Sequence, residues 1–338
     1  MEKDILKKTA EEMVAPGKGI LAADESLPTI EKRFDSINIE STEENRRAYR
    51  DVIFTTQGIE KFISGVIMFD ETLRHSAGDG VPFPKLLASR GIIPGIKVDM
   101  GAKELEGSPE EKLTIGLDGL YERLLEYKKL GARFAKWRAV IVIGEGIPTD
   151  KAIELNAEAL AEYADVCQKA GIVPMIEPEV LMDGDHSIER DEEFTTKVLK
   201  ATYKALRDKG VYLEGSILKP NMVLSGKSAL KQASVPEVAE TTLRVLQATV
   251  PKEVTGITFL SGGQSNELAT ARLNAMNKMG KQPWEISFSY SRALLGPVLG
   301  AWQGKEENRK VAQDAFYKRA RLNSLARQGK YAEEMEKE

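Results

Sequence analysis

Eight short runs of apolar and β-branched residues recur along this chain, and a longer segment with helical spacing follows each run. The runs cover residues 17–24, 62–69, 93–99, 134–142, 172–180, 216–223, 256–263 and 285–292. Strands that alternate with helical crossovers form parallel sheets, so the pattern predicts an α/β fold. Eight such units fit a (β/α)₈ TIM barrel with additional helices at both termini, and a doubly wound open sheet is the structural alternative.

The chain has 338 residues, a length that a single barrel with extensions reaches. It contains no internal repeat, no low-complexity stretch and no linker rich in Pro, Gly or Ser. We therefore expect one domain over residues 1–338, with a short acidic C-terminal tail at about 332–338.

Composition and charge exclude several classes of protein. A net charge of −4 argues against general binding to nucleic acids or anionic membranes, and no apolar run reaches the roughly 18 residues of a membrane span. The first residues show no signal-peptide pattern, which predicts a cytoplasmic protein. The single cysteine, Cys167, excludes an intramolecular disulfide. Two histidines are too few for a His-rich metal centre, and a carboxylate-rich Mg²⁺ site stays possible in principle; our prediction is nonetheless no metal and no cofactor.

Start signals place several helices between the runs. Ser108, Pro109 and Glu111 have the pattern of an N-cap, a first-turn proline and a capping-box acid, so we expect a helix from there to Gly131. Residues 151–170 carry an apolar stripe at helical spacing. Two further helix starts are expected at serine caps, namely Ser234 with Glu237 and Ser265 with Glu267.

A barrel carries its catalytic residues at the C-terminal ends of its strands, and the ends of these runs hold charged or phosphate-binding residue types. These positions are Asp24, Lys97, Asp99, Lys136, Arg138, Glu177, Glu179, Lys219, Asn221, Ser261, Gly262, Gly263, Ser289 and Arg292. Burying an unpaired charge costs on the order of several kcal/mol. We therefore expect these charged residues to pair with one another or to bind a ligand. Asp24 alone also fits a simpler role, as N-cap of a helix that begins near Ser26.

Lys219 is the candidate nucleophile. It stands between Leu218 and Pro220 in a strand-like run, where burial and neighbouring cations favour the neutral amine that attacks carbonyl carbons. The alternative is a lysine whose stem packs while its amine reaches solvent or pairs with Glu177. Both interpretations stay open on the sequence alone.

Two pairs of charged residues share strand faces because residues two apart point to the same side. Lys136 and Arg138 would form a cationic wall for a phosphate or a carboxylate. Glu177 and Glu179 would supply a general acid and a general base if their surroundings hold them in different protonation states. A purely structural lattice of ion pairs is the competing interpretation.

The seventh and eighth runs end in residues that suit a phosphate. Ser261, Gly262 and Gly263 precede an expected helix start, and Ser289 and Arg292 close the eighth run. Barrel enzymes often bind phosphate in the loops after strands seven and eight. Taken alone, the Ser-Gly-Gly sequence is also typical of a tight turn.

Several longer segments carry a family resemblance. GKGILAADES, FAKWRAV, IEPEVLMDGDH, LKPNMV, TFLSGGQS and SFSYSRAL resemble the signature segments of class I fructose-1,6-bisphosphate aldolases, in order, over about residues 5–331. The resemblance implies a metal-independent lyase of glycolysis and gluconeogenesis, usually a homotetramer. Such an enzyme reversibly cleaves fructose 1,6-bisphosphate into dihydroxyacetone phosphate and glyceraldehyde 3-phosphate.

The resemblance also implies roles for individual residues. Lys219 corresponds to the Schiff-base nucleophile, and Glu177, with Glu179 beside it, to the acid/base that dehydrates the carbinolamine. Asp24 corresponds to the carboxylate that handles the C4 hydroxyl proton, with Lys136 in support. Binding roles are implied for Ser261, Gly262 and Arg292 at the ketose phosphate and for Lys97, Arg138 and Arg33 elsewhere around the substrate.

The chain departs from the family pattern at three places. Leu27, Pro28 and Thr29 stand where the family commonly has Thr-Gly-Ser, with Thr29 a candidate phosphate contact, and Ser291 replaces a usual glycine. The tyrosine-ended tail of the animal enzymes is missing, since only AEEMEKE follows Tyr331, so we expect slower enamine protonation or another group in that role. Two alternatives remain: an aldolase that prefers sedoheptulose 1,7-bisphosphate, and a scaffold for cytoskeletal or membrane-complex partners that keeps this fold.

Overall fold

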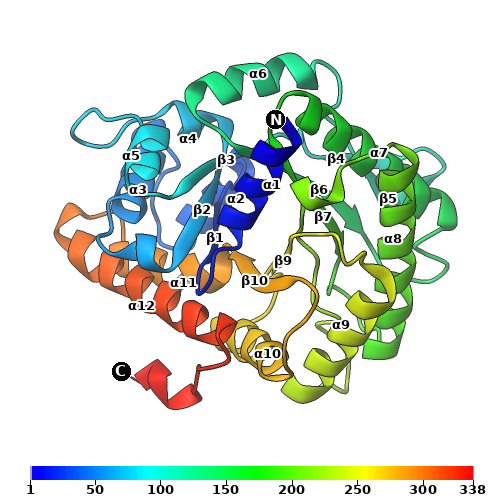
Figure 1. Cartoon of the computed structure of the whole chain (residues 1–338). Helices are drawn as coiled ribbons and strands as arrows, with labels where there is room; N and C mark the ends of the chain where they lie inside the picture. The colour runs from blue at the N-terminus through cyan, green and yellow to red at the C-terminus, as the bar shows by residue number, and fades with distance from the viewer. Residues whose placement is uncertain (1, 338) are drawn as a thin grey trace.

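A closed parallel barrel forms the centre of the molecule (Figure 1). The computed structural model describes residues 2–337. Each of the eight apolar runs contains one barrel strand, which confirms the predicted (β/α)₈ fold. In their order around the barrel the strands are β1 (Gly19–Ala23), β10 (Glu285–Tyr290), β9 (Gly256–Phe259), β8 (Ile217–Leu218), β7 (Val173–Val180), β6 (Phe134–Ile141), β3 (Ile93–Lys97) and β2 (Ile63–Met68).

Helices surround the barrel and cover the outer faces of its strands (Figure 1). They are α2 (Leu27–Asp35), α3 (Glu43–Phe54), α4 (Asp70–Arg74), α5 (Phe83–Ser89), α7 (Asp150–Lys169), α8 (Ile188–Asp208), α9 (Val235–Thr249), α10 (Asn266–Lys278) and α11 (Arg292–Trp302). The predicted apolar stripe of α7 is buried, Ser234 and Glu237 form a capping box on α9, and Ser265 caps α10. Short 3₁₀ turns lie at Ile59–Lys61, Leu213–Gly215 and Glu306–Asn308.

The first helix, α1 (Glu2–Met13), closes the N-terminal end of the barrel. Its buried residues Leu6, Ala10 and Met13 join a cluster with strand residues such as Ile20 and Ile217. In Figure 1 this helix lies across the barrel in front of the strands. Because this end is filled with apolar side chains, the C-terminal ends of the strands are left to form the site.

The C-terminal end of the chain packs beside α12 (Arg309–Arg327) (Figure 1). A 3₁₀ helix, η4 (Glu333–Lys337), spans the described part of the predicted acidic tail, and residue 338 lies outside the described residues. Arg319 donates to both carboxylate oxygens of Glu336 at 2.7 Å, and the Tyr331 hydroxyl donates to the same carboxylate at 3.1 Å. These contacts hold the acidic segment against the outer helices.

The helix predicted from Ser108 to Gly131 is wrong over its first half. An antiparallel hairpin of β4 (Ala102–Leu105) and β5 (Ser108–Thr114) takes its place, and α6 covers only Leu120–Leu130. Gly107 turns the hairpin with a φ of 86°, and Gly119 precedes the helix with a φ of 64°, conformations that favour glycine. The acidic residues and the proline after Ser108 resemble a helix start. Pairing with β4, whose residues lie up to twelve positions upstream, outweighs these local signals and makes the segment a strand.

The predicted capping-box acid of that segment, Glu111, instead supports the start of another helix. It is buried on β5, and its carboxylate accepts hydrogen bonds from the Thr149 N–H at 2.7 Å and from the Thr149 hydroxyl at 2.8 Å. Thr149 is the N-cap of α7, where its hydroxyl accepts from Ala152 N. The hairpin is thereby fastened to the long helix α7.

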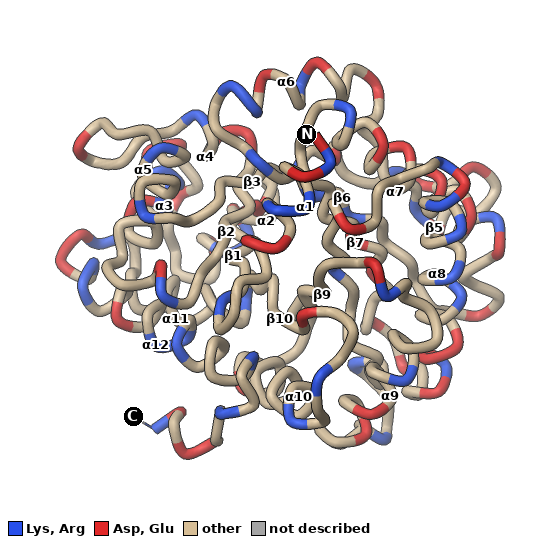
Figure 2. Tube along the Cα trace, in the orientation of Figure 1, with Lys and Arg blue, Asp and Glu red and all other residues tan. Residues whose placement is uncertain are grey.

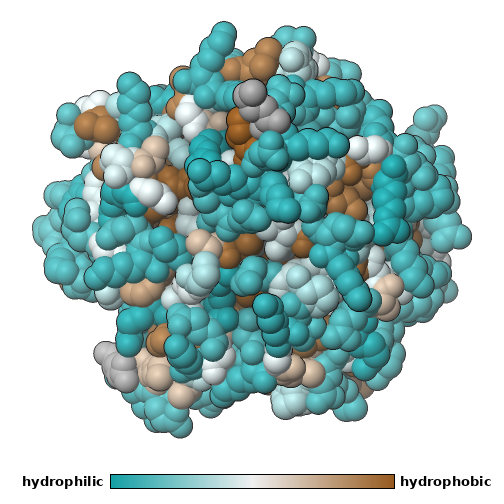
Figure 3. All heavy atoms as spheres, viewed as in Figure 1, coloured by the Kyte–Doolittle hydropathy of each residue, from teal (hydrophilic) through white to brown (hydrophobic). Residues whose placement is uncertain are grey.

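The outer surface is polar and carries mixed charge. Figure 2 shows basic and acidic residues interspersed along the outer helices, and Figure 3 shows only scattered hydrophobic side chains on the face it displays. Over residues 2–337, no helix has the length and apolar character to cross a membrane.

Replacing Glu111 by alanine should lower the free energy of unfolding by about 1–3 kcal/mol, because Thr149 loses a buried acceptor for two hydrogen bonds. Urea unfolding followed by far-ultraviolet circular dichroism measures the change. The neighbouring Glu110 is exposed and serves as the control, since E110A should alter stability by less than about 0.5 kcal/mol. Equal stability of the two variants would contradict the role given to Glu111.

Candidate active site

A cavity of about 1240 Å³ opens at the C-terminal ends of the barrel strands. All the residues predicted for the site line it except Asn221 and Gly263. Gly263 lies beside this lining, where its N–H faces the Met182 sulfur at 3.2 Å. The barrel thus brings together residues from nearly the whole length of the chain.

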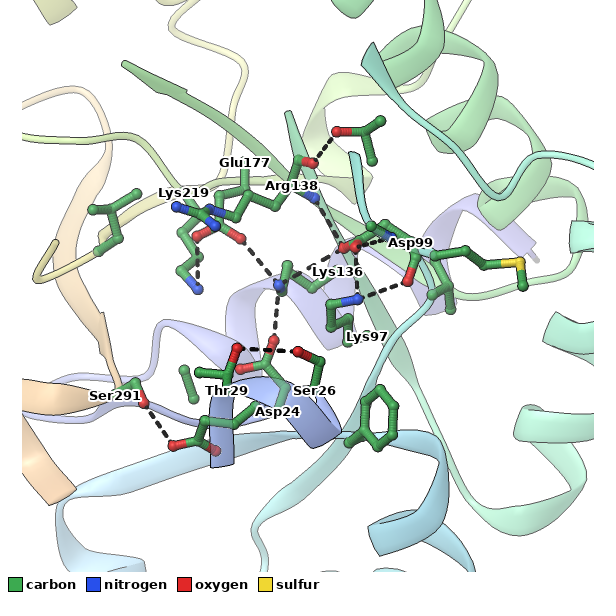
Figure 4. Close-up of a pocket in the computed structure, with 18 of the residues that line it drawn as sticks. Asp24, Ser26, Thr29, Lys97, Asp99, Lys136, Arg138, Glu177, Lys219 and Ser291 are labelled. Atoms are coloured by element: carbon green, nitrogen blue, oxygen red, sulfur yellow. Dashed lines mark hydrogen bonds and ion pairs between the residues drawn. The ribbon is translucent and has the colours of Figure 1, made fainter. Parts of the chain in front are cut away.

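A continuous chain of buried charges crosses the cavity floor (Figure 4). Lys219 Nζ lies 3.0 Å from Glu177 Oε1, and the other oxygen of Glu177 lies 3.3 Å from Lys136 Nζ. Lys136 Nζ continues to Asp24 Oδ2 at 2.8 Å and faces Asp99 Oδ2 at 3.9 Å. Lysine and carboxylate therefore alternate along a path that leads from β8 to β1.

The strand register explains why these groups meet. Along β6 and β7, residues two apart point into the barrel, so Lys136 and Arg138 of one strand lie beside Glu177 and Glu179 of the next. The side chains of Lys136 and Glu177 are each only 4% exposed. The shared faces predicted from the two spacings are confirmed.

Mutual pairing sets the protonation of the central groups. Burial alone would raise the pKa of Asp24, but the positive charges of Lys136 and Lys219 hold that pKa well below its ordinary value. Burial alone would lower the pKa of Lys136, but Asp24 and Glu177 raise it well above its ordinary value. At neutral pH, Asp24 is therefore a carboxylate and Lys136 an ammonium.

Asp24 pairs with Lys136 and does not cap the helix that begins after Ser26. The prediction that Asp24 is the N-cap of that helix is therefore wrong.

Glu179 and Lys97 have partners of their own. The carboxylate of Glu179 pairs with the guanidinium of Arg138, and Lys97 Nζ lies 2.6 Å from Asp99 Oδ1. The two adjacent glutamates of β7 consequently have different surroundings: Glu177 faces two lysines, whereas Glu179 faces one arginine. This difference suits separate roles for the two acids.

The opposite wall of the cavity carries hydroxyl groups, a glycine turn and arginines. Ser261 and Gly262 follow β9, and Gly262 has a φ of 54°, which favours glycine. Ser289, on β10, is buried, and its hydroxyl has no hydrogen-bond partner among the described residues. Arg292 begins α11, and burial and the nearby positive charge of Arg33 lower its pKa. An unpaired buried hydroxyl beside cations is suited to bind an anionic oxygen.

Thr29 and Ser26 lie at the mouth of the cavity, at the start of α2. Their hydroxyl oxygens are 3.0 Å apart (Figure 4). Thr29 is exposed, so its hydroxyl is accessible to a ligand.

Comparison with known proteins identifies the family. Residues 5–338 match the family model described as fructose-bisphosphate aldolase class-I. The chain belongs to this family. It is 55% identical over 332 residues to the probable fructose-bisphosphate aldolase class 1 of Xanthomonas campestris pv. campestris, a match that covers 98% of this chain and 99% of the relative. This aldolase is thus a lyase, and the resemblance of its motifs is confirmed.

Relatives from distant organisms show the same agreement. Fructose-bisphosphate aldolase C of Carassius auratus is 53% identical, with 98% of this chain and 92% of the relative covered. A solved structure of the Plasmodium falciparum aldolase, in complex with TRAP and a small-molecule inhibitor, superposes with a TM-score of 0.97 at 51% identity, over 98% of this chain and 96% of that chain. The aldolase fold is therefore retained along the whole chain.

Sequence reasoning missed three residues that shape this aldolase site. They are Glu25, Arg50 and Asp191. Glu25 was within reach of the sequence, because it follows Asp24 directly. Arg50 and Asp191 lie on helices far from any motif, so no local signal points to them.

The strand that precedes Lys219, β8, is the shortest in the barrel, because Pro220 has no N–H to continue the ladder. Lys219 N still donates to Ile176 O at 2.8 Å. Beyond it, Asn221 Oδ1 accepts a hydrogen bond from Val180 N at 3.0 Å and joins the segment to β7. Side chains thereby replace the missing backbone pairing next to the candidate nucleophile.

Asp191 holds the same segment from the helix side. Its carboxylate accepts from Leu224 N at 2.6 Å and from the Thr195 hydroxyl at 2.7 Å. Among residues 2–337 no basic side chain lies within ion-pair distance of it. Burial therefore raises the pKa of Asp191 to about 7.

This buried acid predicts a pH dependence of stability. The folded-state pKa of about 7 exceeds the ordinary value of 3.8, so protonation of Asp191 favours folding, and that stabilisation is lost as the pH rises toward and through 7. In D191N the dependence disappears. Relative to wild type, its free energy of unfolding should rise by about 2–3 kcal/mol between pH 5 and pH 8.

Urea unfolding of both proteins across this pH range measures the effect. D185N removes an exposed carboxylate nearby and should follow the wild-type curve. Parallel pH curves for D191N and wild type would show that Asp191 does not titrate as described.

Proposed function

We propose that this aldolase cleaves fructose 1,6-bisphosphate through a Schiff base on Lys219. The 3.0 Å contact between Lys219 Nζ and Glu177 Oε1 carries the proposal. One proton transfer across this contact converts the ammonium into a neutral amine and the carboxylate into a carboxylic acid. The same step thus prepares both the nucleophile and the general acid.

The neutral Lys219 amine attacks the C2 carbonyl carbon and forms a carbinolamine. Glu177 donates its proton to the C2 hydroxyl, which leaves as water, and the nitrogen lone pair closes the protonated imine. The adjacent ammonium of Lys136, 3.3 Å from Glu177 Oε2, stabilises the carboxylate that Glu177 becomes after this donation.

Cleavage of the C3–C4 bond follows. Asp24, kept ionised by Lys136, accepts the proton of the C4 hydroxyl, and the C4–O electrons form the aldehyde of glyceraldehyde 3-phosphate. The electrons of the broken bond move into the imine and give an enamine, so the cation on the Lys219 nitrogen is the electron sink. Protonation at C3 and hydrolysis of the imine release dihydroxyacetone phosphate and regenerate the lysine.

The two phosphates would be held on opposite sides of the cavity. Ser261, Gly262 and Arg292 follow β9 and β10, whereas Lys97 and Arg138 belong to β3 and β6 across the barrel. Anchoring both ends fixes the scissile bond between Lys219 and Asp24. Thr29, Arg33, Ser289 and Glu179 complete the proposed set, and Gly263 supports the turn of the phosphate loop.

The family resemblance also supports a homotetrameric enzyme of the cytoplasm, acting on small-molecule sugar bisphosphates. The mixed charges of the outer helices agree with a protein that does not bind nucleic acid.

Incubation with dihydroxyacetone phosphate and borohydride should attach a reduced adduct to the peptide that contains Lys219, because borohydride reduces an imine to a stable secondary amine. Mass spectrometry detects the adduct, and EDTA should leave it unchanged. K219R should give no adduct at this peptide. An adduct on another lysine, or activity lost to EDTA, would refute the proposed nucleophile.

E177Q should lower kcat about 10²- to 10⁴-fold, because an amide cannot donate the proton that expels water. Steady-state cleavage assays measure the change, and the rate of borohydride trapping should fall in parallel. E189Q alters an exposed glutamate on α8 and serves as the control. A kcat for E177Q within tenfold of wild type would assign the acid role to another group.

A further inference from the structure

Ser291, the residue that replaces the usual glycine, connects two charged side chains that line the cavity. Figure 4 labels Ser291 and marks one of its contacts. Its hydroxyl accepts a hydrogen bond from Arg33 Nη2 at 3.1 Å and donates one to Glu25 Oε1 at 3.1 Å. Arg33 Nη1 also contacts that carboxylate oxygen directly. The three groups form a closed ring of contacts that joins the end of β10 to α2.

Glu25 provides the fixed point of this ring. Its side chain is 3% exposed, and its other oxygen, Oε2, pairs with Arg50 Nη2 at 2.5 Å. With an arginine on each oxygen, the carboxylate has little freedom to turn. Burial alone would raise the pKa of Glu25, but Arg50 and Arg33 lower it, so the group stays ionised at neutral pH.

The Ser291 hydroxyl determines how many N–H groups of Arg33 bind the Glu25 carboxylate. A guanidinium prefers to bind a carboxylate with two parallel N–H groups. Here only Nη1 of Arg33 reaches Glu25, while Nη2 is bound to Ser291. Without the hydroxyl, Nη2 is free to turn onto Glu25, and the guanidinium withdraws from the cavity.

Electrostatic repulsion from a second arginine, Arg292, favours this withdrawal of Arg33. Arg33 and Arg292 both line the cavity, and the positive charge of Arg33 helps to lower the pKa of Arg292. Two guanidiniums repel each other unless an anion lies between them. Among the described residues, Arg292 has no carboxylate within ion-pair distance, so it cannot offset this repulsion by pairing.

We propose that Ser291 is a positioning residue that holds Arg33 beside Arg292, so that both guanidiniums bind one substrate phosphate. Arg33 keeps N–H groups that neither Glu25 nor Ser291 uses, and these are available to the anion. The inference rests on the proposed function, which makes this wall of the cavity a phosphate site. It adds a positioning hydroxyl at a place where the family commonly has glycine.

S291A tests the proposal, since it removes the hydroxyl and leaves the backbone intact. The KM for fructose 1,6-bisphosphate should rise about fivefold to twentyfold while kcat stays within about twofold of wild type, because the lost bond orients a binding group and not a reacting one. The dissociation constant of inorganic phosphate, measured by calorimetry, should rise by a similar factor.

A double-mutant cycle separates positioning from a merely structural role. If Ser291 acts through Arg33, S291A should raise KM less than about twofold in an R33A background. S36A is the matched control, because the exposed Ser36 hydroxyl also contacts Arg33, but at its carbonyl oxygen, and should leave KM unchanged.

An unchanged KM in S291A, or effects of S291A and R33A that simply add, would overturn the proposal. Borohydride trapping on Lys219 is run in parallel on wild type and variants. Absence of the adduct in wild type would reject the proposed function, while phosphate affinity would still test Ser291. An adduct with unaltered phosphate affinity in S291A would reject only the role of the serine.

Discussion

The ammonium of Lys136 is surrounded by carboxylates inside the barrel, and the arrangement of the site depends on it. Asp24 lies 2.8 Å from its nitrogen, Glu177 3.3 Å and Asp99 3.9 Å. Lys219 and Lys97 balance the remaining negative charge, so three lysines face three carboxylates. Without this balance, each buried charge would cost several kcal/mol, on the order measured for broken buried pairs. The charged side chains at the ends of β1, β3, β6, β7 and β8 can be buried together because their charges neutralise one another.

The same balance prepares the chemistry. Because Lys136 is held as an ammonium, it keeps Asp24 ionised. In the proposed mechanism, Asp24 is thereby ready to accept a proton, and Lys136 stabilises the carboxylate that Glu177 becomes after it donates its proton. On the other wall, a second buried carboxylate is also kept ionised by neighbouring positive charges, because Glu25 lies between Arg33 and Arg50. There the arginines outnumber the carboxylate, which leaves positive charge for an anion. The balanced charges and the excess of positive charge thus lie on different walls of one cavity.

The barrel strands and most of the site were predictable because both rest on local patterns. Period-two spacing placed Lys136 with Arg138 and Glu177 with Glu179, and the strand ends bring most of the candidate residues to one cavity. The helix predicted from Ser108 was wrong, since a pairing partner upstream outweighed the local cap signals. The sequence left open whether Lys219 is a nucleophile or is paired with Glu177. In the structure its amine is paired with Glu177, and this contact is also compatible with the proton transfer that a nucleophile needs.

The sequence by itself determined the elements and the residue types of this site, because hydrophobic periodicity and strand-end chemistry are encoded over a few neighbouring residues. Only the tertiary structure decided which charges meet. The contact between Ser291 and Glu25 joins residues 266 positions apart, and Asp191 reaches Leu224 across 33. Closing the barrel brings such distant groups within about 3 Å, the range over which hydrogen bonds and ion pairs set protonation and geometry.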